Sequence, residues 1–205
     1  MSANGPDRFN EEYAAIQVRR SRNPLRRMVR YWYLSDILKH VNGPGIDFGC
    51  GAGDLLARMP TGSIGLELNP AAVEYCRGRG LDVFPYDPES DGYRLEEIQS
   101  GKYRCMFFTH VLEHLESPDE VLRRVLCSCR RIGVTRVVIT QPCEKGFKFD
   151  QTHRTYVDPV YFRESGLFEL EGFSVSSHYH FPLNVSWLGS YYTFHEWRVV
   201  YDIIP

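Results

Sequence analysis

Three glycines alternate with other residues in one short segment, Asp47-Phe-Gly49-Cys50-Gly51-Ala-Gly53-Asp54. Glycine adopts backbone angles that side chains forbid, and it lets a ligand approach the main chain closely. A dinucleotide-binding loop has the spacing G-x-G-x-x-G, which would place its third glycine at position 54, where this sequence has Asp54. Such a loop also binds a pyrophosphate, whereas the carboxylate of Asp47 suits a cationic amino group better. The segment therefore predicts a ligand with a cationic group rather than a dinucleotide.

Two further carboxylates follow the next predicted strands. Glu67 ends the segment Ser63–Leu68, twenty residues after Asp47, where it can accept hydrogen bonds from both hydroxyls of a ribose. Asp87 follows the third predicted strand, where its carboxylate can accept a hydrogen bond from the amino group of an adenine. For Asp87 the role of a plain surface carboxylate is equally open.

Histidines and a carboxylate cluster after the fourth and fifth predicted strands. His110, Glu113 and His114 follow the fourth strand, and His153 follows the fifth. In one interpretation these side chains only cap and pack the loop. In a second, His110 or His153 is a general base that removes a proton from an acceptor hydroxyl. In a third, the four side chains bind a divalent metal ion that holds two acceptor oxygens.

Strands and helices alternate along most of the chain. Predicted strands cover 45–48, 63–68, 81–84, 103–108 and 134–140, and predicted helices cover 23–40, 54–59, 70–79, 93–99, 118–131 and 158–167. Such alternation indicates right-handed crossovers and a doubly wound, open parallel sheet. Two long strands, 173–181 and 191–203, then follow without a helix between them. The predicted fold is α/β, mostly parallel, with a C-terminal antiparallel strand pair.

These motifs resemble those of class I S-adenosylmethionine-dependent methyltransferases, which have a Rossmann-like sheet. The segment Asp47–Gly53 is similar to their first motif and Gly65–Pro70 to their second. The segment Phe107-Phe-Thr-His-Val-Leu-Glu-His-Leu115 resembles the fourth-strand segment of a subgroup that includes ubiquinone-pathway O-methyltransferases. The resemblance implies a seven-stranded sheet and S-adenosylmethionine as cofactor. The implied cofactor-binding residues are Asp47, Gly49, Cys50, Gly51, Gly53, Glu67, Leu68, Asp87, Thr109 and His110.

The small-RNA terminal 2′-O-methyltransferases are also similar at this point. They place a Glu-x-x-Glu-His segment and a further histidine on a metal ion. This chain has His110 where their first glutamate stands, which disfavours a hard ion such as magnesium.

Composition narrows the class of protein. The 205 residues fit one domain, for which we expect the bounds 23–205, after a partly loose N-terminal segment, 1–22. A net charge of −2 argues against a dedicated nucleic-acid binder, although six arginines lie between Arg19 and Arg30. No apolar run reaches the roughly 18 residues of a membrane span, and the six cysteines lack disulfide spacing. We therefore expect a cytoplasmic enzyme; the sequence indicates no oligomeric state.

The predicted activity is methylation of a small-molecule acceptor, on oxygen rather than nitrogen. Late aromatic residues are expected to pack mostly in the terminal strand pair, with Trp187 and Tyr191 as a possible wall of the acceptor pocket. One alternative is an RNA-end 2′-O-methyltransferase, which the arginine cluster and the metal-like residues favour. Another is a catalytically inactive, cofactor-binding partner subunit, which the intact glycine loop and Glu67 disfavour.

Overall fold

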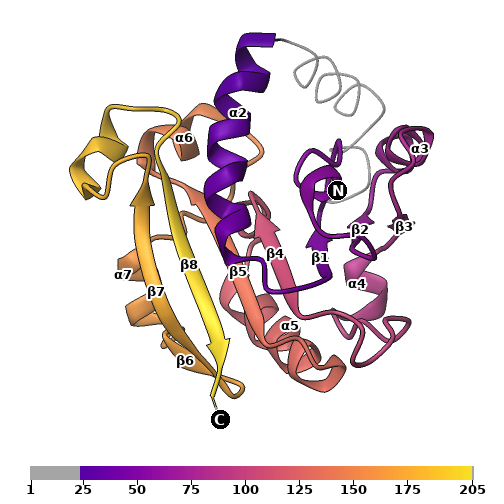
Figure 1. The fold of residues 1–205 in the computed structure, drawn as a ribbon. Coiled ribbons are helices and arrows are strands. Elements are labelled where there is room, and N and C mark those ends of the chain that lie inside the picture. The colour runs from indigo at the N-terminus through magenta and orange to yellow at the C-terminus, as the bar shows by residue number, and fades with distance from the viewer. Residues whose placement is uncertain (1–23, 205) are drawn as a thin grey trace, which may run out of the picture.

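A mostly parallel sheet forms the centre of the molecule (Figure 1). The computed structural model describes residues 24–204. Within this range the sheet has eight strands in the order β3-β2-β1-β4-β5-β8-β7-β6. The strands are β1 (Gly45–Phe48), β2 (Ile64–Glu67), β3 (Val83–Pro85), β4 (Cys105–Thr109), β5 (Arg136–Pro142), β6 (Glu169–Leu170), β7 (Phe173–Phe181) and β8 (Glu196–Ile203). Strands β1 to β5 are parallel, and β8, β7 and β6 run antiparallel to their neighbours.

Helices cover both faces of this sheet. The helical segments are α2 (Pro24–Ile37), η2 (Leu38–His40), η3 (Leu56–Arg58), α3 (Pro70–Gly78), α4 (Pro88–Asp91), η4 (Leu112–His114), α5 (Pro118–Ile132), α6 (Glu144–Phe149), α7 (Pro159–Glu164) and η5 (Ser186–Ser190). Apolar residues of α2 and α3 pack with Phe107 and Val138 on one face. Those of α5 and α7 pack with Phe108 and Ile139 on the other. This arrangement confirms the doubly wound α/β fold.

The central strands form where the sequence is apolar on both faces. The side chains of β4 are buried up to its last residue, Thr109, and those of β5 are buried after its first, Arg136. A strand that is buried on both sides needs apolar residues at successive positions, which is the pattern of a parallel sheet between helices. Helix α5 begins with Pro118 and ends at Ile132, followed by Gly133, whose φ of 83° is left-handed. Residues at its two ends therefore determine where it starts and stops.

The sheet has one strand more than the predicted seven. The additional strand is the two-residue β6, which pairs with the start of β7. Glu171 and Gly172 connect the two strands with φ angles of 53° and 80°. Left-handed angles at both positions are those of a two-residue type I′ hairpin turn, which glycine favours.

The predictions of two short helices, at 93–99 and 54–59, were wrong. Residues 93–99 form no helix, because Gly92, Tyr93 and Leu95 have positive φ angles. The helical turn lies earlier, at α4, where Asp87 caps the first backbone amides. Residues 54–59 contain only the 3₁₀ turn η3 rather than an α-helix.

The predictions at the two ends of the chain have different outcomes. Helix α2 was expected, but the N-terminal segment 1–22 and Asn23 lie outside the described residues. The last predicted strand begins at Glu196 rather than Tyr191, since η5 and a turn precede it. Within residues 24–204 no helix is both long and apolar enough to cross a membrane.

Candidate active site

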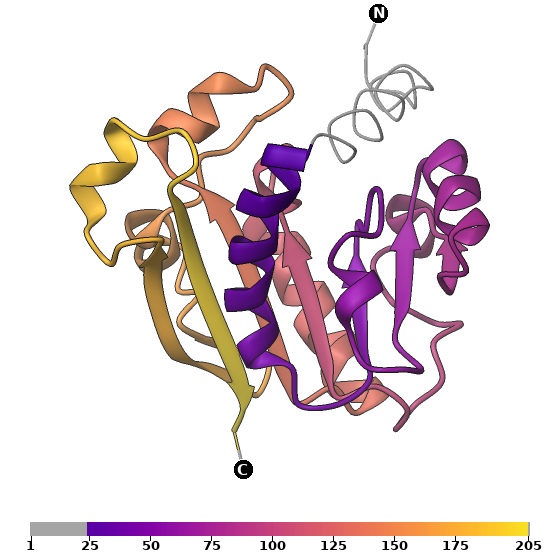
Figure 2. The same ribbon diagram turned by 45° about the horizontal axis from the view of Figure 1, so that its top comes forward.

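The candidate residues gather at the carboxyl ends of the parallel strands. The strand order reverses between β1 and β4, and ligands of open α/β sheets bind at such a switch point. Figure 2 shows the arrowheads of the parallel strands at one edge of the sheet, near the start of α2. The loop after β1, the end of β2 and the segment after β4 all meet there.

The glycine loop has the backbone conformation that its composition predicts. Gly49, Gly51 and Gly53 have φ angles of 69°, 53° and 72°, all left-handed. A Cβ at Gly49 would lie 2.9 Å from Val111 Cγ2, and one at Gly53 would lie 2.6 Å from Leu81 Cδ1. At Gly51 a Cβ would meet no atom within 4 Å. Two glycines are therefore required by close packing, and Gly51 faces open space.

Glu67 is held firmly at the tip of β2. Its Oε2 accepts the backbone N–H of Gly51 at 2.7 Å, and its Oε1 accepts that of Asn69 at 2.8 Å. Each carboxylate oxygen can accept a second hydrogen bond. The carboxylate is thus positioned by the loop and can still accept from a ligand.

Asp47 is a buried carboxyl beside this loop. It is 3 % exposed. Burial raises its pKa to about 7, against a backbone hydrogen bond from Leu56 that lowers it, and the neighbouring charge of Glu67 raises it further. A cation placed beside Asp47 would favour its ionised form.

The remaining predicted cofactor residues lie around the same strand ends. Cys50 is buried, and Leu68 is 42 % exposed. Asp87 is exposed, and its Oδ1 accepts the N–H groups of Glu89 and Ser90 as the cap of α4. The Thr109 hydroxyl is buried and makes no protein hydrogen bond.

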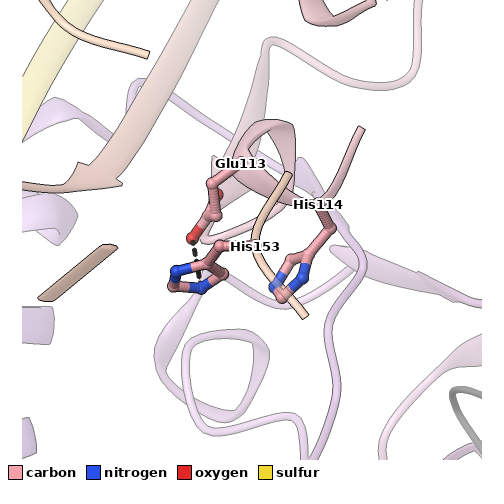
Figure 3. A group of neighbouring side chains, drawn as sticks. All are labelled: Glu113, His114 and His153. Atoms are coloured by element: carbon pink, nitrogen blue, oxygen red, sulfur yellow. Dashed lines mark ion pairs between the residues drawn. The ribbon is translucent and has the colours of Figure 1, made fainter. Parts of the chain in front are cut away.

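Glu113, His114 and His153 form a compact group after β4 and β5 (Figure 3). Each offers one ligand atom, and these atoms lie within 4.8 Å of one another. The ring centroids of the two histidines are 4.8 Å apart. Glu113 is fully buried, and its Oε2 has no protein partner.

Local hydrogen bonds fix which nitrogen of each ring carries a proton. His153 Nδ1 lies 2.8 Å from the carbonyl oxygen of Phe147, so this nitrogen donates. His114 Nδ1 lies 3.1 Å from the hydroxyl oxygen of Thr152, and that hydroxyl donates to Asp150 at 2.7 Å, so Nδ1 donates here as well. Burial lowers the pKa of His114, which favours the neutral ring. In neutral rings the unprotonated nitrogen is then Nε2.

His110 lies beside this group but has different partners. Its Nδ1 lies 3.1 Å from Glu113 Oε1, and its Nε2 lies 3.0 Å from Glu196 Oε1. Because carboxylates only accept, both ring nitrogens donate and the ring is an imidazolium. Desolvation opposes this charge, but the hydrogen bonds to Glu113 and Glu196 outweigh it and raise the pKa of His110 to about 10. The side chain is 39 % exposed, so water screens part of the interaction. This state disfavours His110 as a general base at neutral pH.

Sequence reasoning missed the acidic and basic residues that support His110. Glu196 Oε2 accepts from Arg198 at 2.8 Å, and Arg198, which is fully buried, also donates to Asp36 of α2. The sequence did contain a signal for this pair. Arg198 follows Glu196 by two residues in a strand otherwise rich in apolar residues, and side chains two residues apart in a strand point to the same face. The pairing of β8 with β5 places them at the site.

Two of the late aromatic residues that we expected in the core, Tyr192 and Phe194, are 38 % and 56 % exposed. Trp197 is in the core, but Trp187 and Tyr191 are 66 % and 71 % exposed. Their rings pack edge to face, 6.2 Å apart, on and just after η5. They are therefore available to contact a ligand.

Comparison with known proteins identifies the family. A family model described as a methyltransferase domain (Methyltransf_23) matches residues 16–178. The chain belongs to this family. It is an S-adenosylmethionine-dependent methyltransferase. No curated protein sequence matches the methyltransferase significantly.

Solved structures of similar fold are distant in sequence. An S-adenosylmethionine-dependent methyltransferase from Archaeoglobus fulgidus is 18% identical, with 86% of this chain and 94% of that chain covered and a TM-score of 0.64. Magnesium protoporphyrin IX methyltransferase from Synechocystis is 13% identical, with 96% and 97% covered and a TM-score of 0.65. A putative methyltransferase from Haloferax volcanii, in complex with the Trm112 activator, is 14% identical, with 95% and 96% covered and a TM-score of 0.66. At these identities the likeness concerns the fold.

Proposed function

We propose that this methyltransferase methylates a hydroxyl oxygen of a small molecule. One observation carries the proposal: Nε2 of His153 faces Oε1 of Glu113 across 3.9 Å, with Glu113 fully buried (Figure 3). In a neutral His153 ring, two atoms with lone pairs face each other, and a bridging group that donates a proton would relieve their repulsion. A hydroxyl group satisfies this need. The resemblance of the segment Phe107–Leu115 to that of ubiquinone-pathway O-methyltransferases supports oxygen as the acceptor atom.

The methyl donor would lie along the glycine loop. The open side of Gly51 leaves room for the cofactor against the backbone, and Glu67 would accept the ribose hydroxyls. The amino group of the donor would face Asp47, whose carboxyl is buried and ionises more readily beside a cation. Leu68 would pack against the adenine, with Asp87 near its amino group.

The chain's own groups would orient the acceptor and take its proton. As the oxygen–methyl bond forms, the sulfur–methyl bond breaks, and its electron pair stays on sulfur, which becomes a neutral thioether. The hydroxyl proton would move to Nε2 of His153, while Oε2 of Glu113 accepts a second donor of the acceptor or a water molecule. The protein mainly supplies alignment and removes water from the reacting atoms.

An apolar part of the acceptor would contact the exposed aromatic residues of η5. Trp187 and Tyr191 present large rings that no other described residue covers fully.

Free cysteines at all six positions fit an enzyme of the cytoplasm, where thiols remain reduced.

An acceptor panel tests the proposal. Isotope-labelled S-adenosylmethionine is incubated with hydroxylated, carboxylated and amine compounds, and the products are treated with mild alkali, which cleaves methyl esters but not methyl ethers. We expect alkali-stable products from hydroxylated compounds. His153→Ala should lower kcat by roughly 10²–10⁴-fold, as loss of a general base does, without weakening donor binding. His178→Ala, at an exposed histidine of β7, is the control. Ester products, or full activity of His153→Ala, would contradict the proposal.

A divalent metal ion is a second candidate for the same three side chains. Glu113, His114 and His153 are two imidazoles and one carboxylate, a set that suits zinc, manganese or iron better than magnesium. The unpartnered Oε2 of Glu113 fits such an ion, which would hold acceptor oxygens and lower their pKa. His110 would not be a ligand, because Glu113 and Glu196 use both of its nitrogens. Chelation that abolishes turnover and leaves donor binding intact would favour the metal; unchanged turnover would favour His153 as base.

A nucleic-acid acceptor is disfavoured. Of the arginine cluster, Arg30 is paired with Asp54 of the glycine loop, which removes it from the groups available to a phosphate track. Arg19, Arg20 and Arg22 lie outside the described residues. A small acceptor should lose at most about tenfold in affinity between low and physiological salt, whereas an RNA end should follow a steep log–log slope. A steep slope that disappears in Arg26, Arg27 and Arg30 variants would overturn our choice.

A further inference from the structure

A chain of alternating charges connects helix α2 to the acceptor site. Asp36 of α2 accepts from Arg198, Arg198 donates to Glu196, and Glu196 accepts from His110. His110 in turn donates to Glu113. The order of charges is negative, positive, negative, positive, negative. Along this series, from Asp36 to Glu113, every charged group is therefore in contact with at least one group of opposite charge.

Burial makes the geometry of this chain specific. The Arg198 side chain is fully buried, and those of Asp36 and Glu196 are 10 % and 13 % exposed. Charges that are removed from water are stable only when opposite charges and hydrogen bonds surround them. The two Nη groups of Arg198 meet this condition with Asp36, Glu196 and the carbonyl oxygen of Tyr33, whereas its buried Nε has no hydrogen-bond partner. Moving one member would leave a buried charge without its partner.

The position of β8 brings the carboxylate to the site. Because β8 runs antiparallel to β5, its first residue lies at the carboxyl end of β5, with Glu196 paired to Pro142. Glu196 and Arg198 are two residues apart and so point to the same face, the one covered by α2. Tyr179 of β7 also donates to Asp36, at 2.8 Å. Strands β7 and β8 therefore both donate to the same carboxylate of α2.

His110 has a strained backbone that needs outside support. Its φ of 58° is left-handed, although it is not a glycine. Such a conformation is unfavourable for a residue with a side chain and persists where the surroundings determine it. The backbone N–H of His110 donates to Thr140 at 3.0 Å, and carboxylates lie within 3.1 Å of its two ring nitrogens. Without Glu196 the ring would keep only the hydrogen bond to Glu113.

We propose that Glu196 is a positioning residue for methyl transfer, acting through His110 to orient the carboxylate of Glu113 toward the acceptor. Arg198 fixes Glu196 in turn, so the docking of α2 through Asp36 helps to assemble the site. This inference rests on the proposed function, because it assigns Glu113 to the acceptor. It goes beyond that function by giving the last described strand a part in the reaction.

A double-mutant cycle tests the proposal with the hydroxylated acceptor that gives the highest turnover in the panel. Glu196→Ala should lower kcat about tenfold to a hundredfold, as a misplaced catalytic group does, while the acceptor KM and donor affinity change little. Glu196→Asp should recover part of kcat. Combining Glu196→Ala with His110→Ala should lower kcat no further than the larger single effect, because residues that act as one unit are not additive.

The control and a second measurement keep the result interpretable. Asp202→Ala breaks the ion pair with Arg136 at the other end of β8, and we expect unchanged kcat. A crystal structure of Glu196→Ala, or of Glu196→Asp if the alanine variant does not fold, should show the His110 ring displaced from Glu113. Additive effects, unchanged kcat or an unmoved ring would each overturn the proposal. If His153→Ala also keeps full activity, the proposed function fails; if His153→Ala is inactive, only the inference about Glu196 fails.

Discussion

Most residues assigned to the methyl donor lie between Asp47 and Asp87, with Thr109 and His110 further along the chain, whereas those assigned to the acceptor come from segments as far apart as Glu113 and Glu196. The donor half is built from backbone: left-handed glycines and two N–H groups that hold Glu67. The acceptor half is built from side chains that meet only after the sheet has formed. A site formed by the backbone of one short segment can be predicted from the spacing of its residues. A site formed by side chains from distant segments can be predicted only when the register between the strands is known.

Of the changes that separate the donor half from the acceptor half, Glu67→Ala should have the largest effect, a loss of donor affinity. Loss of a charge-assisted pair of hydrogen bonds should weaken donor binding by about 1.5–3 kcal/mol, roughly tenfold to 150-fold. Turnover at saturating donor should be retained, because the acceptor half is unchanged. Calorimetry with the demethylated product measures the effect, with the exposed Glu97→Ala as control. A loss under about half a kcal/mol would mean that Glu67 does not bind the ribose.

The pH dependence of donor binding should be the next largest effect. Asp47 has a pKa of about 7 without a ligand. A cationic donor binds its ionised form, so affinity should fall by about tenfold between pH 8 and pH 6. For the donor-free fold the sign is opposite: the raised pKa means that the stability contributed by neutral Asp47 is present at low pH and is lost as pH rises toward about 7. Asp47→Asn should remove both dependences; a flat affinity profile for the unmodified enzyme would place the cation elsewhere.

A smaller effect is expected on the acceptor side from Trp187→Ala. Loss of an aromatic contact should raise the acceptor KM about threefold to tenfold, a cost of roughly 1 kcal/mol of apolar contact. Donor affinity should not change. Steady-state kinetics with each substrate varied in turn measure this, with Ile204→Ala as the control at an exposed apolar residue. An equal change in donor affinity would show that the aromatic residues do not belong to the acceptor half alone.

The smallest effect should come from Arg30→Ala. Helix α2 contacts both halves, through Arg30 and Asp54 on the donor side and through Asp36 and Arg198 on the acceptor side. Arg30 is 43 % exposed, and exposed ion pairs contribute less than about 1 kcal/mol. Denaturant unfolding should show a correspondingly small loss. A loss several times larger would mean that α2 depends on the donor loop as much as on its buried contact.

Much of the fold was predictable, and the reasons differ between elements. The alternation of apolar strands and helices predicted the doubly wound sheet, and Phe173–Phe181 is a strand with the predicted bounds. The prediction of a helix at 93–99 was wrong because Tyr93 and Leu95 have left-handed φ angles, which nothing in their residue types predicts. Strand β6 was missed because two residues carry no periodic pattern, although the Glu171-Gly172 turn is compatible with a hairpin.

The candidate site was predictable only in part. The glycine loop and Glu67 follow from spacing, and the grouping of Glu113, His114 and His153 follows from the strands that precede them. Glu196 was not found, because its place beside His110 depends on the register between β5 and β8. The charge state of His110 was not found either, since it needs both carboxylates in position.

The place of β8 in the sheet also bears on how the chain matures. It comes later in the sequence than every other described strand, yet it lies between β5 and β7. Until β8 emerges from the ribosome, the apolar strand β5 has an unpaired edge, which is the kind of surface at which nascent chains associate. Insertion of β8 closes that edge, and it also delivers Glu196 to His110. The same event that protects the nascent chain from aggregation would thus complete the proposed acceptor site, so molecules whose synthesis stops before β8 should have an incomplete acceptor site.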